Sequence, residues 1–205
     1  APIAQEDLEK PVVVCSTSVF SSIVEDMLGD SCYVITIVPP GMCPGHYDVK
    51  PSDVYAVQVA DVIFYHGFEP WMQELIESTE TNATIVQIGG NWNTPDGAKK
   101  YISCVAGNLS LALGLDLNET LSSTLSAVDE VAEEILEEAR KQSQLKHPNI
   151  VTVYSAGIAD NTPYIAMEYM EGGSLRERIG KLDLDEVIDV FKAMLRALDY
   201  AHSMN

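Results

Sequence analysis

Four short apolar segments in the first half of the chain alternate with segments of helical spacing, and no hairpin turn joins any two of them. They predict β-strands at residues 11–15, 33–38, 62–65 and 84–88. Apolar strands that alternate with helices pair in parallel, because each helix carries the chain back before the next strand begins. The predicted fold class is therefore α/β, a parallel sheet with flanking helices.

Ligands of such sheets bind outside the carboxyl ends of the strands. Here those ends lead into residues 15–17, 40–48, 65–67 and 89–93. These segments contain two of the four histidines, His46 and His66, and two of the four cysteines, Cys15 and Cys43. This gathering is the strongest functional signal that the residues give by themselves.

The second half of the chain has a different pattern. Thr94 and Pro95 predict the start of a helix, and residues 125–145 predict a long helix rich in Glu, Ala and Leu. Beyond it, strands at 150–154 and 164–169 flank turn residues and predict a hairpin, followed by helices at 175–179 and 187–202. The predicted domains are a flexible tail (1–10), an α/β lobe (11–125), a long connecting helix (126–145) and a small α+β segment (146–205).

Charge and composition exclude some classes of function. A formal net charge of −19 argues against binding to nucleic acid or to an anionic membrane surface, both of which need basic patches. Attraction of cations and simple solubility both remain open as explanations of this charge. With 46% hydrophobic residues the chain can bury a core, and no run of 18 apolar residues predicts a membrane span.

The cysteines do not form a recognisable framework. None of the four belongs to a Cys-x-x-Cys pair, so a structural zinc site is not expected. Cys15 and Cys43 follow strands that we expect to be neighbours. They could form a thiolate pair or a disulfide, or serve as small buried hydrophobic residues.

Several motifs in the first half occur together and in a fixed order. They are Val12 to Ser18, Val38-Pro39-Pro40-Gly41, Tyr47 with Pro51-Ser52-Asp53, Ala60 to Tyr65, and Glu69-Pro70-Trp71. Over residues 11–135 the chain resembles the zinc- and manganese-type substrate-binding proteins of ABC importers. The resemblance implies one of two α/β lobes that hold a divalent metal between them, a membrane permease as partner, and an extracellular or periplasmic location.

The resemblance also implies metal ligands. The family has a histidine in the loop after its second strand; by register this position is Gly45, and we assign the role to His46, one place later. His66 follows the third strand and is the second candidate. A neutral imidazole suits zinc, and a nearby carboxylate such as Asp48 or Glu69 could bind the metal or orient an imidazole. The predicted metal site therefore comprises His46, His66, Asp48 and Cys43, with zinc or manganese as the ion.

The last part of the chain resembles a different family. The motifs are Leu145 to Val151, Thr162 to Leu175 and Ala197 to Ser203. Residues 134–205 resemble a bacterial-type Ser/Thr protein kinase from its C helix to its E helix. The resemblance places Glu138 at the glutamate that pairs with the nucleotide-binding lysine, and residues 168–170 at the adenine-binding hinge.

We nevertheless expect no phosphoryl transfer. No Gly-rich phosphate loop and no Val-Ala-x-Lys strand precede Glu138, and neither the catalytic aspartate nor an Asp-Phe-Gly motif occurs in the sequence. The two resemblances also imply different compartments, since a kinase would be cytoplasmic. A chimera joined within residues 129–144, or a natural fusion, accounts for both. The alternatives to metal binding are a protein without retained activity and an inactive kinase-like interaction module, and a homodimer is a further possibility.

Overall fold

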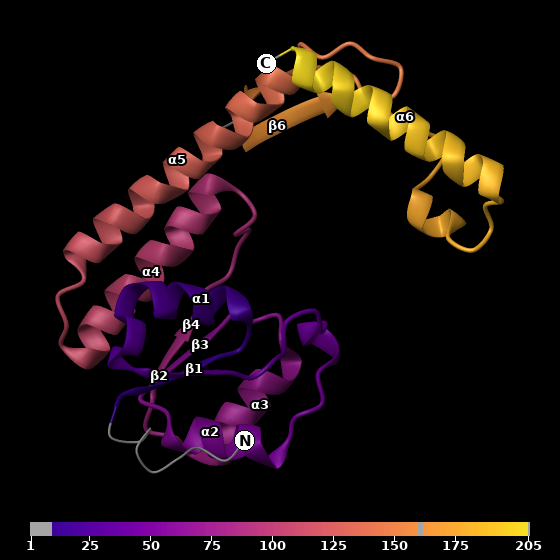
Figure 1. The fold of residues 1–205 in the computed structure, drawn as a ribbon. Helices are drawn as coiled ribbons and strands as arrows, with labels where there is room; N and C mark the ends of the chain where they lie inside the picture. The colour runs from indigo at the N-terminus through magenta and orange to yellow at the C-terminus, as the bar shows by residue number, and fades with distance from the viewer. Residues whose placement is uncertain (1–9, 160–161, 205) are drawn as a thin grey trace. The chain divides into compact units, whose positions relative to one another are not determined.

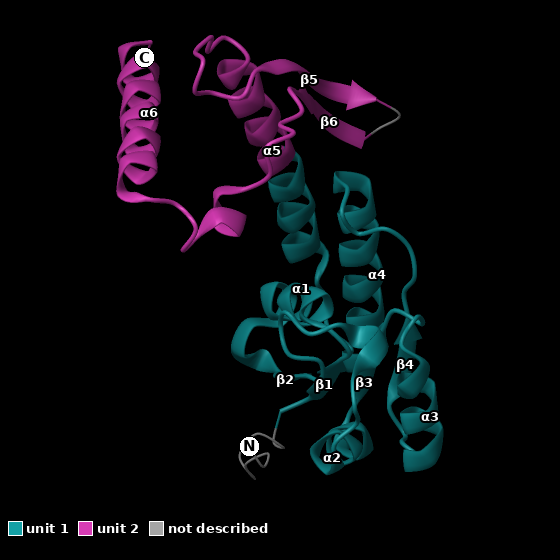
Figure 2. Ribbon diagram, turned by 90° about the vertical axis from the view of Figure 1, so that its right-hand side faces the viewer, with its two compact units in different colours: residues 1–129 teal, residues 130–205 magenta. Residues whose placement is uncertain are grey.

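The computed structural model describes residues 10–159 and 162–204, and the chain divides into two compact units, residues 1–129 and 130–205 (Figures 1 and 2). The predicted flexible tail lies, except for Lys10, outside the described residues. None of the helices in the described part combines the length and apolar character that crossing a bilayer requires.

Unit 1 is built on a four-stranded parallel sheet, as predicted. Its strands are β1 (Val12–Cys15), β2 (Tyr33–Thr36), β3 (Val62–Tyr65) and β4 (Thr84–Gln87), in the order β2-β1-β3-β4. In the two pairings of β1, Val14 lies beside Ile35 of β2 and Ile63 of β3. Because β1 and β3 are neighbours while β2 lies on the far side of β1, the strand order changes direction between β1 and β3. Ligand sites of α/β sheets form at such a point.

The helices of unit 1 begin where the sequence offers start signals. They are α1 (Ser18–Leu28), α2 (Pro51–Val59), α3 (Pro70–Thr79), α4 (Pro95–Leu113) and the first part of α5 (Asn118–Gln142). Proline is the first residue of three of them. The first helical position needs no N–H donor, and the φ angle that it requires is the one to which the proline ring is fixed. At α4 the Thr94 side chain also accepts a hydrogen bond from the Gly97 N–H at 3.1 Å.

Helices cover both faces of this sheet (Figure 1). Helices α1 and α4 pack on one face, over the side chains of Val13, Cys15 and Phe64. Helices α2 and α3 pack on the other, over Val14 and Ile63. Both sides of each central strand are therefore buried, which explains why these strands are continuously apolar instead of alternating with polar residues.

Unit 2 contains the last part of α5, an antiparallel hairpin, a short 3-10 helix and a long terminal helix. Their bounds are β5 (Val153–Ala159), β6 (Thr162–Met167), η4 (Leu175–Arg178) and α6 (Leu184–Ser203). The hairpin is confirmed, although β5 begins three residues later than predicted because the Ile150 N–H bonds back to the His147 carbonyl in a turn. Helix α6 begins three residues earlier than predicted, since the Asp183 side chain accepts from the Glu186 N–H at 2.8 Å.

Candidate metal site

A cleft of about 370 Å³ lies at the carboxyl edge of the sheet in unit 1. Its walls come from the segments that follow all four strands: Thr17, Ser18 and Val19, Val38 to Met42, Pro44, His66, Phe68 and Trp92. Most of these side chains are apolar. The parallel strands thus bring together, at one edge of the sheet, the segments that the sequence indicates as candidates for ligand binding.

His66 stands at the end of β3 and is 3% exposed. Its Nε2 lies 2.9 Å from the Thr17 Oγ1, and its Nδ1 lies 3.2 Å from the Tyr101 hydroxyl. That hydroxyl donates to the Ile88 carbonyl at 2.9 Å, so it accepts from an Nδ1–H of the imidazole. The Nε2 lone pair then accepts the Thr17 proton. A metal could bind this nitrogen only by displacing that hydroxyl.

Aromatic rings enclose the His66 imidazole. The rings of Phe20, Phe68 and Trp92 have centroids 4.4, 4.9 and 4.5 Å from it. Burial lowers the pKa of His66, and the carboxylate of Glu69 opposes this shift. The imidazole is therefore neutral at neutral pH, and in this form its Nε2 can accept from the Thr17 hydroxyl.

Glu69 is buried and fixes the turn after β3. Its carboxylate accepts from the Ser16 hydroxyl at 2.6 Å, the His66 N–H at 3.1 Å and the Gly67 N–H at 2.8 Å. These donors come from the carboxyl ends of both central strands. Glu69 therefore ties β1 to β3 at the edge of the cleft and positions His66 through its backbone.

Cys43 and His46 lie together on the loop after β2. Cys43 directly precedes the short 3-10 helix η3 (Pro44–His46), and His46 is its last residue; the His46 N–H closes this turn by bonding to the Cys43 carbonyl at 3.2 Å. The His46 Nδ1 lies 3.4 Å from the Cys43 Sγ, and both side chains are exposed. Asp48 is also exposed and lies two residues beyond His46. A thiol and an imidazole thus meet at the surface of this edge.

Two contacts anchor this loop to the body of unit 1. The Trp71 indole Nε1 donates to the Pro44 carbonyl at 2.7 Å. The Tyr47 ring lies 5.2 Å from that indole, and its hydroxyl donates to Asp53 Oδ2 at 2.9 Å. Burial, with this hydrogen bond, raises the pKa of Tyr47 to about 12. The loop is therefore held on both sides of His46.

The structure does not bring all the predicted ligands together. Cys43 and His46 are in contact, whereas His66 is enclosed by other partners. Within residues 10–159 and 162–204, no group of three or more His, Cys, Asp or Glu side chains could hold a metal ion. The assignment of His46, His66, Asp48 and Cys43 as ligands stays a prediction.

The disulfide considered for Cys15 and Cys43 does not form. Each of the four cysteines is a free thiol. Cys15 is buried in the core under α1 and Cys43 is exposed on the loop, so of the three alternatives Cys15 takes the role of a small hydrophobic residue. Burial raises the pKa of the Cys15 thiol well above its ordinary value, which keeps it protonated.

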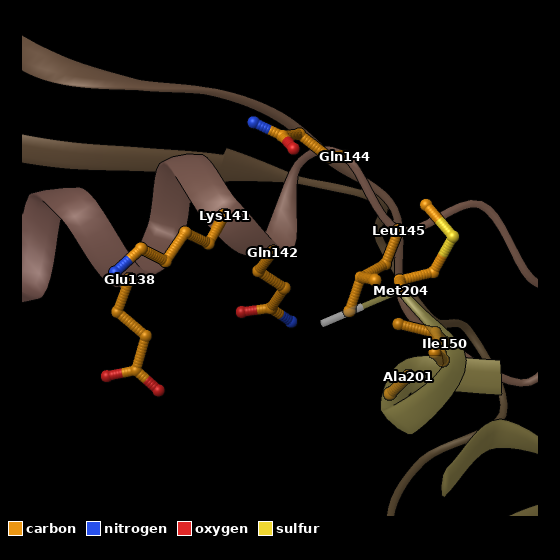
Figure 3. Close-up of a pocket in the computed structure, with 8 residues that line it drawn as sticks. All are labelled: Glu138, Lys141, Gln142, Gln144, Leu145, Ile150, Ala201 and Met204. Atoms are coloured by element: carbon orange, nitrogen blue, oxygen red, sulfur yellow. The ribbon is translucent and has the colours of Figure 1, made fainter. Parts of the chain in front are cut away.

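Unit 2 has a separate pocket of about 500 Å³ (Figure 3). Figure 3 shows that Glu138, Lys141 and Gln142 reach it from helix α5, while Ala201 and Met204 reach it from the end of α6. Glu138 is exposed, and the ammonium of Lys141 pairs with Glu137 at 2.9 Å. The described side chains around Glu138 thus do not reproduce the glutamate–lysine pair that the kinase resemblance implies for this residue.

Comparison with known protein families identifies the larger part of the chain. The family model described as zinc-uptake complex component A, periplasmic, matches residues 13–149, two thirds of the sequence. The chain belongs to this zinc-uptake family. A second model, the protein kinase domain, matches residues 121–205, so the two matches overlap over residues 121–149, most of α5 and the turn that follows it.

Individual relatives repeat this division. The chain is 36% identical over 85 residues to the manganese-binding lipoprotein MntA of Halalkalibacterium halodurans, covering 40% of this chain and 28% of that protein. It is 40% identical over 67 residues to the serine/threonine-protein kinase PrkC of Bacillus subtilis, covering 31% of this chain and 10% of the kinase. The chain therefore spans less than a third of the length of either relative.

Solved structures of the zinc-uptake fold confirm the architecture. The periplasmic zinc-binding protein TroA of Treponema pallidum matches with a TM-score of 0.56 at 18% identity, over 67% of this chain and 57% of that one. The metal-dependent lipoprotein YcdH of Bacillus subtilis matches with a TM-score of 0.57 at 17% identity, over 64% and 57%. At these identities the likeness establishes the fold.

Sequence reasoning missed the partners that enclose His66 in this zinc-uptake lobe. Thr17 and Trp92 fall within the edge segments 15–17 and 89–93 that the sequence indicates, but no signal links either of them to His66, and Tyr101 lies in the helix expected to begin at Pro95. The contact between Thr17 and His66 could have been predicted, because the two residues follow β1 and β3, which end at the same edge of the sheet. Tyr101 carried no such signal, since it lies well inside α4 and its position depends on how that helix packs.

Proposed function

We propose that unit 1 is a substrate-binding lobe of an ABC metal importer and binds a divalent metal at the carboxyl edge of its sheet. The observation that carries the proposal is the contact between Cys43 and His46 on the anchored loop after β2. Membership of the zinc-uptake family and similarity to a manganese-binding lipoprotein support it. The partner implied is a membrane permease, and the location implied is extracellular or periplasmic.

The chemistry of this edge is suited to capture of an ion. A neutral imidazole and a thiolate are both ligands of borderline divalent cations. Cys43 and His46 are exposed, so an ion can reach them without displacing protein atoms. Water, Asp48 or groups from another part of the assembled importer protein would complete the coordination.

Titration calorimetry with zinc and with manganese tests this function on the full chain. We expect saturable binding of one ion that is lost in the His46→Ala variant. The matched control is His202→Ala, which removes an exposed histidine of α6 and is expected to leave binding unchanged. Absence of binding in a chain that is folded by circular dichroism would overturn the proposal and favour a chimera without retained activity.

For the kinase-like unit we propose no phosphoryl transfer. The support lies in the sequence before Glu138, which belongs to the zinc-uptake match and contains neither a Gly-rich loop nor a Val-Ala-x-Lys strand. Catalysis by kinases depends on those groups to hold the phosphates. Incubation with radiolabelled ATP and a generic protein substrate should give no incorporation. Incorporation that disappears in a Glu138→Ala variant would contradict the proposal.

A further inference from the structure

One face of helix α6 in unit 2 is apolar and exposed to solvent (Figure 2). We propose that this face binds the same face of a second copy of the chain, so that two α6 helices pair antiparallel in a weak dimer. The face belongs to unit 2, so it is separate from the metal site proposed for unit 1.

Helix α6 has two apolar faces, and the first of them lies against the body of unit 2. Its side chains are small or short and partly buried: Val187, Val190, Ala193, Ala197 and Ala201. Val190 and Ala193 line a cavity of about 330 Å³ together with Pro148 from the turn after α5. From the same side of α6, the Tyr200 hydroxyl accepts from the Lys146 N–H at 3.2 Å. This face therefore joins α6 to its own unit.

The second face, which we call the α6 seam, is made of larger side chains. They are 40–73% exposed: Leu184, Ile188, Phe191, Leu195 and Leu198. With 3.6 residues per turn, the seam lies about 130° around α6 from the first face. A surface helix normally has one apolar face, and a second contiguous one marks a site of interaction. The seam therefore needs a partner other than the first face has.

The spacing of the seam favours another helix as this partner. Its residues are successively four, three, four and three positions apart, which is the alternation of the a and d positions in a coiled coil. Side chains with this alternation pack against a helix of the same alternation at a crossing angle of about 20°. The α6 helix of a second copy provides the matching surface.

The charges beside the seam make it complementary to itself. Asp185, Lys192 and Asp199 follow one another at intervals of seven residues along one edge of the seam, so their signs alternate. In an antiparallel pair of helices, this edge of one copy meets the same edge of the other. One such register places Leu184 of each copy opposite Leu195 of the other. Asp185 of each copy then lies beside Lys192 of the other, and two opposite-charge contacts form.

Other arrangements of two α6 helices lack this match. If antiparallel helices overlapped over their full length, Lys192 would meet Lys192, and Asp185 would meet Asp199. In a parallel pair, the charged edge would meet an edge of the seam that carries no charge. The Lys192 ammonium is free to make the new contact, because its side chain is 58% exposed and its present pair with Asp189, at 3.4 Å, is on the surface.

The dimer is expected to be weak. Helix α6 is about 30 Å long at 1.5 Å per residue, and small interfaces, which bury less than about 1,200 Å² in total, form transient complexes. The formal net charge of −19 on each copy also opposes association. We expect a dissociation constant on the order of 100 µM. At low micromolar concentration the chain is then monomeric and α6 is exposed.

Sedimentation equilibrium of the full chain, from about 5 µM to about 500 µM, tests the dimer. A phosphine reductant prevents disulfides through the exposed Cys43. Leu195→Glu places a carboxylate within the seam and should raise the dissociation constant at least about 10-fold, since burying an unpaired charge is costly. The matched control is Leu111→Glu on α4, at a leucine that is 85% exposed, and it should leave the constant unchanged.

A charge exchange tests the antiparallel contact. Lys192→Glu places a carboxylate beside Asp185 of the other copy and should raise the dissociation constant about 3- to 10-fold, because the contact occurs twice in each dimer. The double variant Asp185→Lys/Lys192→Glu restores opposite charges and should return the constant to within about 2-fold of the wild type. Equal helical dichroism in all variants excludes unfolding as the cause of any change.

Three results would overturn the proposal. The first is a wild type that stays monomeric at every concentration, which would leave the seam without a second copy as its partner. The second is association that Leu195→Glu does not weaken, or that continues beyond the dimer, since contacts outside the seam would then cause it. The third is a double variant that associates as poorly as Lys192→Glu, which would exclude the antiparallel contact. None of these results bears on metal binding by unit 1.

Discussion

Units 1 and 2 both contain regularly spaced apolar residues, but they differ in how far those side chains are buried. In unit 1 the side chains of Phe20, Ile63 and Phe64 are fully buried on the two faces of the sheet. In unit 2 the buried hydrophobic residues among those described are Leu136, Ala139 and Val153. The series on α6 is spaced four and three residues apart and is 40–73% exposed: Leu184, Ile188, Phe191, Leu195 and Leu198.

The difference shows that the signals in a sequence that form a helix are separate from those that bury its apolar face. Helix α6 forms from local terms, namely its periodicity and the capping box of Asp183 with Glu186. Burial of its apolar face depends instead on elements that pack against it, and local spacing does not specify those. A close resemblance to part of a protein kinase therefore predicts the elements of unit 2 without predicting a closed core.

The largest expected effect comes from truncating a core phenylalanine of unit 1, compared with truncating a phenylalanine of α6 in unit 2. Phe64→Ala should destabilise unit 1 by about 3–5 kcal/mol, because it leaves a cavity in a packed core. Phe191→Ala, at a ring that is 60% exposed, should change stability by about 0.5 kcal/mol or less. Both tryptophans, Trp71 and Trp92, belong to unit 1, so their fluorescence in urea follows its unfolding.

Far-ultraviolet circular dichroism of the same samples reports the helices of both units. A loss of stability in Phe191→Ala as large as that in Phe64→Ala would show that α6 is packed in solution. The contrast between the units would then be wrong.

A second comparison uses one glutamate from each unit. Glu69→Ala should destabilise unit 1 by about 2–4 kcal/mol, because it leaves the buried Ser16 hydroxyl and His66 N–H without an acceptor. Glu168 is exposed and accepts from the Thr152 N–H at 3.4 Å, so Glu168→Ala should cost about 0.5 kcal/mol or less. Equal urea midpoints for these two variants would contradict the role assigned to Glu69.

Removing a helix cap should cost about the same stability in either unit, but a different probe should detect the loss in each. Thr94→Ala and Asp183→Ala each remove a side chain that accepts from an N–H in the first turn, at a cost of about 1 kcal/mol. The first should shift the tryptophan transition of unit 1. The second should lower helical dichroism and leave that transition unchanged. A tryptophan shift in Asp183→Ala would mean that α6 stabilises the sheet.

The smallest effect expected is on the pH dependence of unit 1. The pKa of His66 is lowered from its ordinary value of 6.5, so the folded unit binds fewer protons there than the unfolded chain. The contribution of His66 to the stability of unit 1 is fully present above pH 6.5. It decreases as the pH drops through 6.5 toward the lower pKa of the folded state. Glu69 and Tyr101 are the titratable groups that face the ring.

The His66→Asn variant provides the control, since asparagine does not titrate. Urea midpoints from tryptophan fluorescence should fall more steeply in the wild type than in this variant between about pH 7 and about pH 5.5. Parallel slopes for the two proteins would show that the imidazole is not buried as the structure places it.

Much of the fold could be predicted from the sequence because its signals are local. The strand at 62–65 and the Thr94–Pro95 start of α4 were predicted to the residue, since a short apolar run and a cap specify them without reference to distant segments. The parallel pairing followed from the alternation of strands and helices. The start of β5 was missed because a turn at His147 to Ile150 competes with strand pairing there.

The candidate site was less accessible to sequence reasoning. The edge of the sheet could be named, because parallel strands deliver their carboxyl ends to one side. The contact between Cys43 and His46 depends on the 3-10 turn between them, and the enclosure of His66 depends on the packing of α4. Those are properties of the assembled unit, which a histidine and a strand end do not specify.

We propose that unit 1 binds metal at the turn of residues 43–46 and that unit 2 takes no part in the binding. Hydrogen exchange followed by mass spectrometry, with and without zinc, tests it directly on the full chain. We predict slow exchange in β1 and β3, faster exchange in α6, and added protection by zinc confined to residues 41–48 and the segments beside them. Zinc protection within residues 162–204, or equal protection of α6 and β1 without zinc, would contradict it.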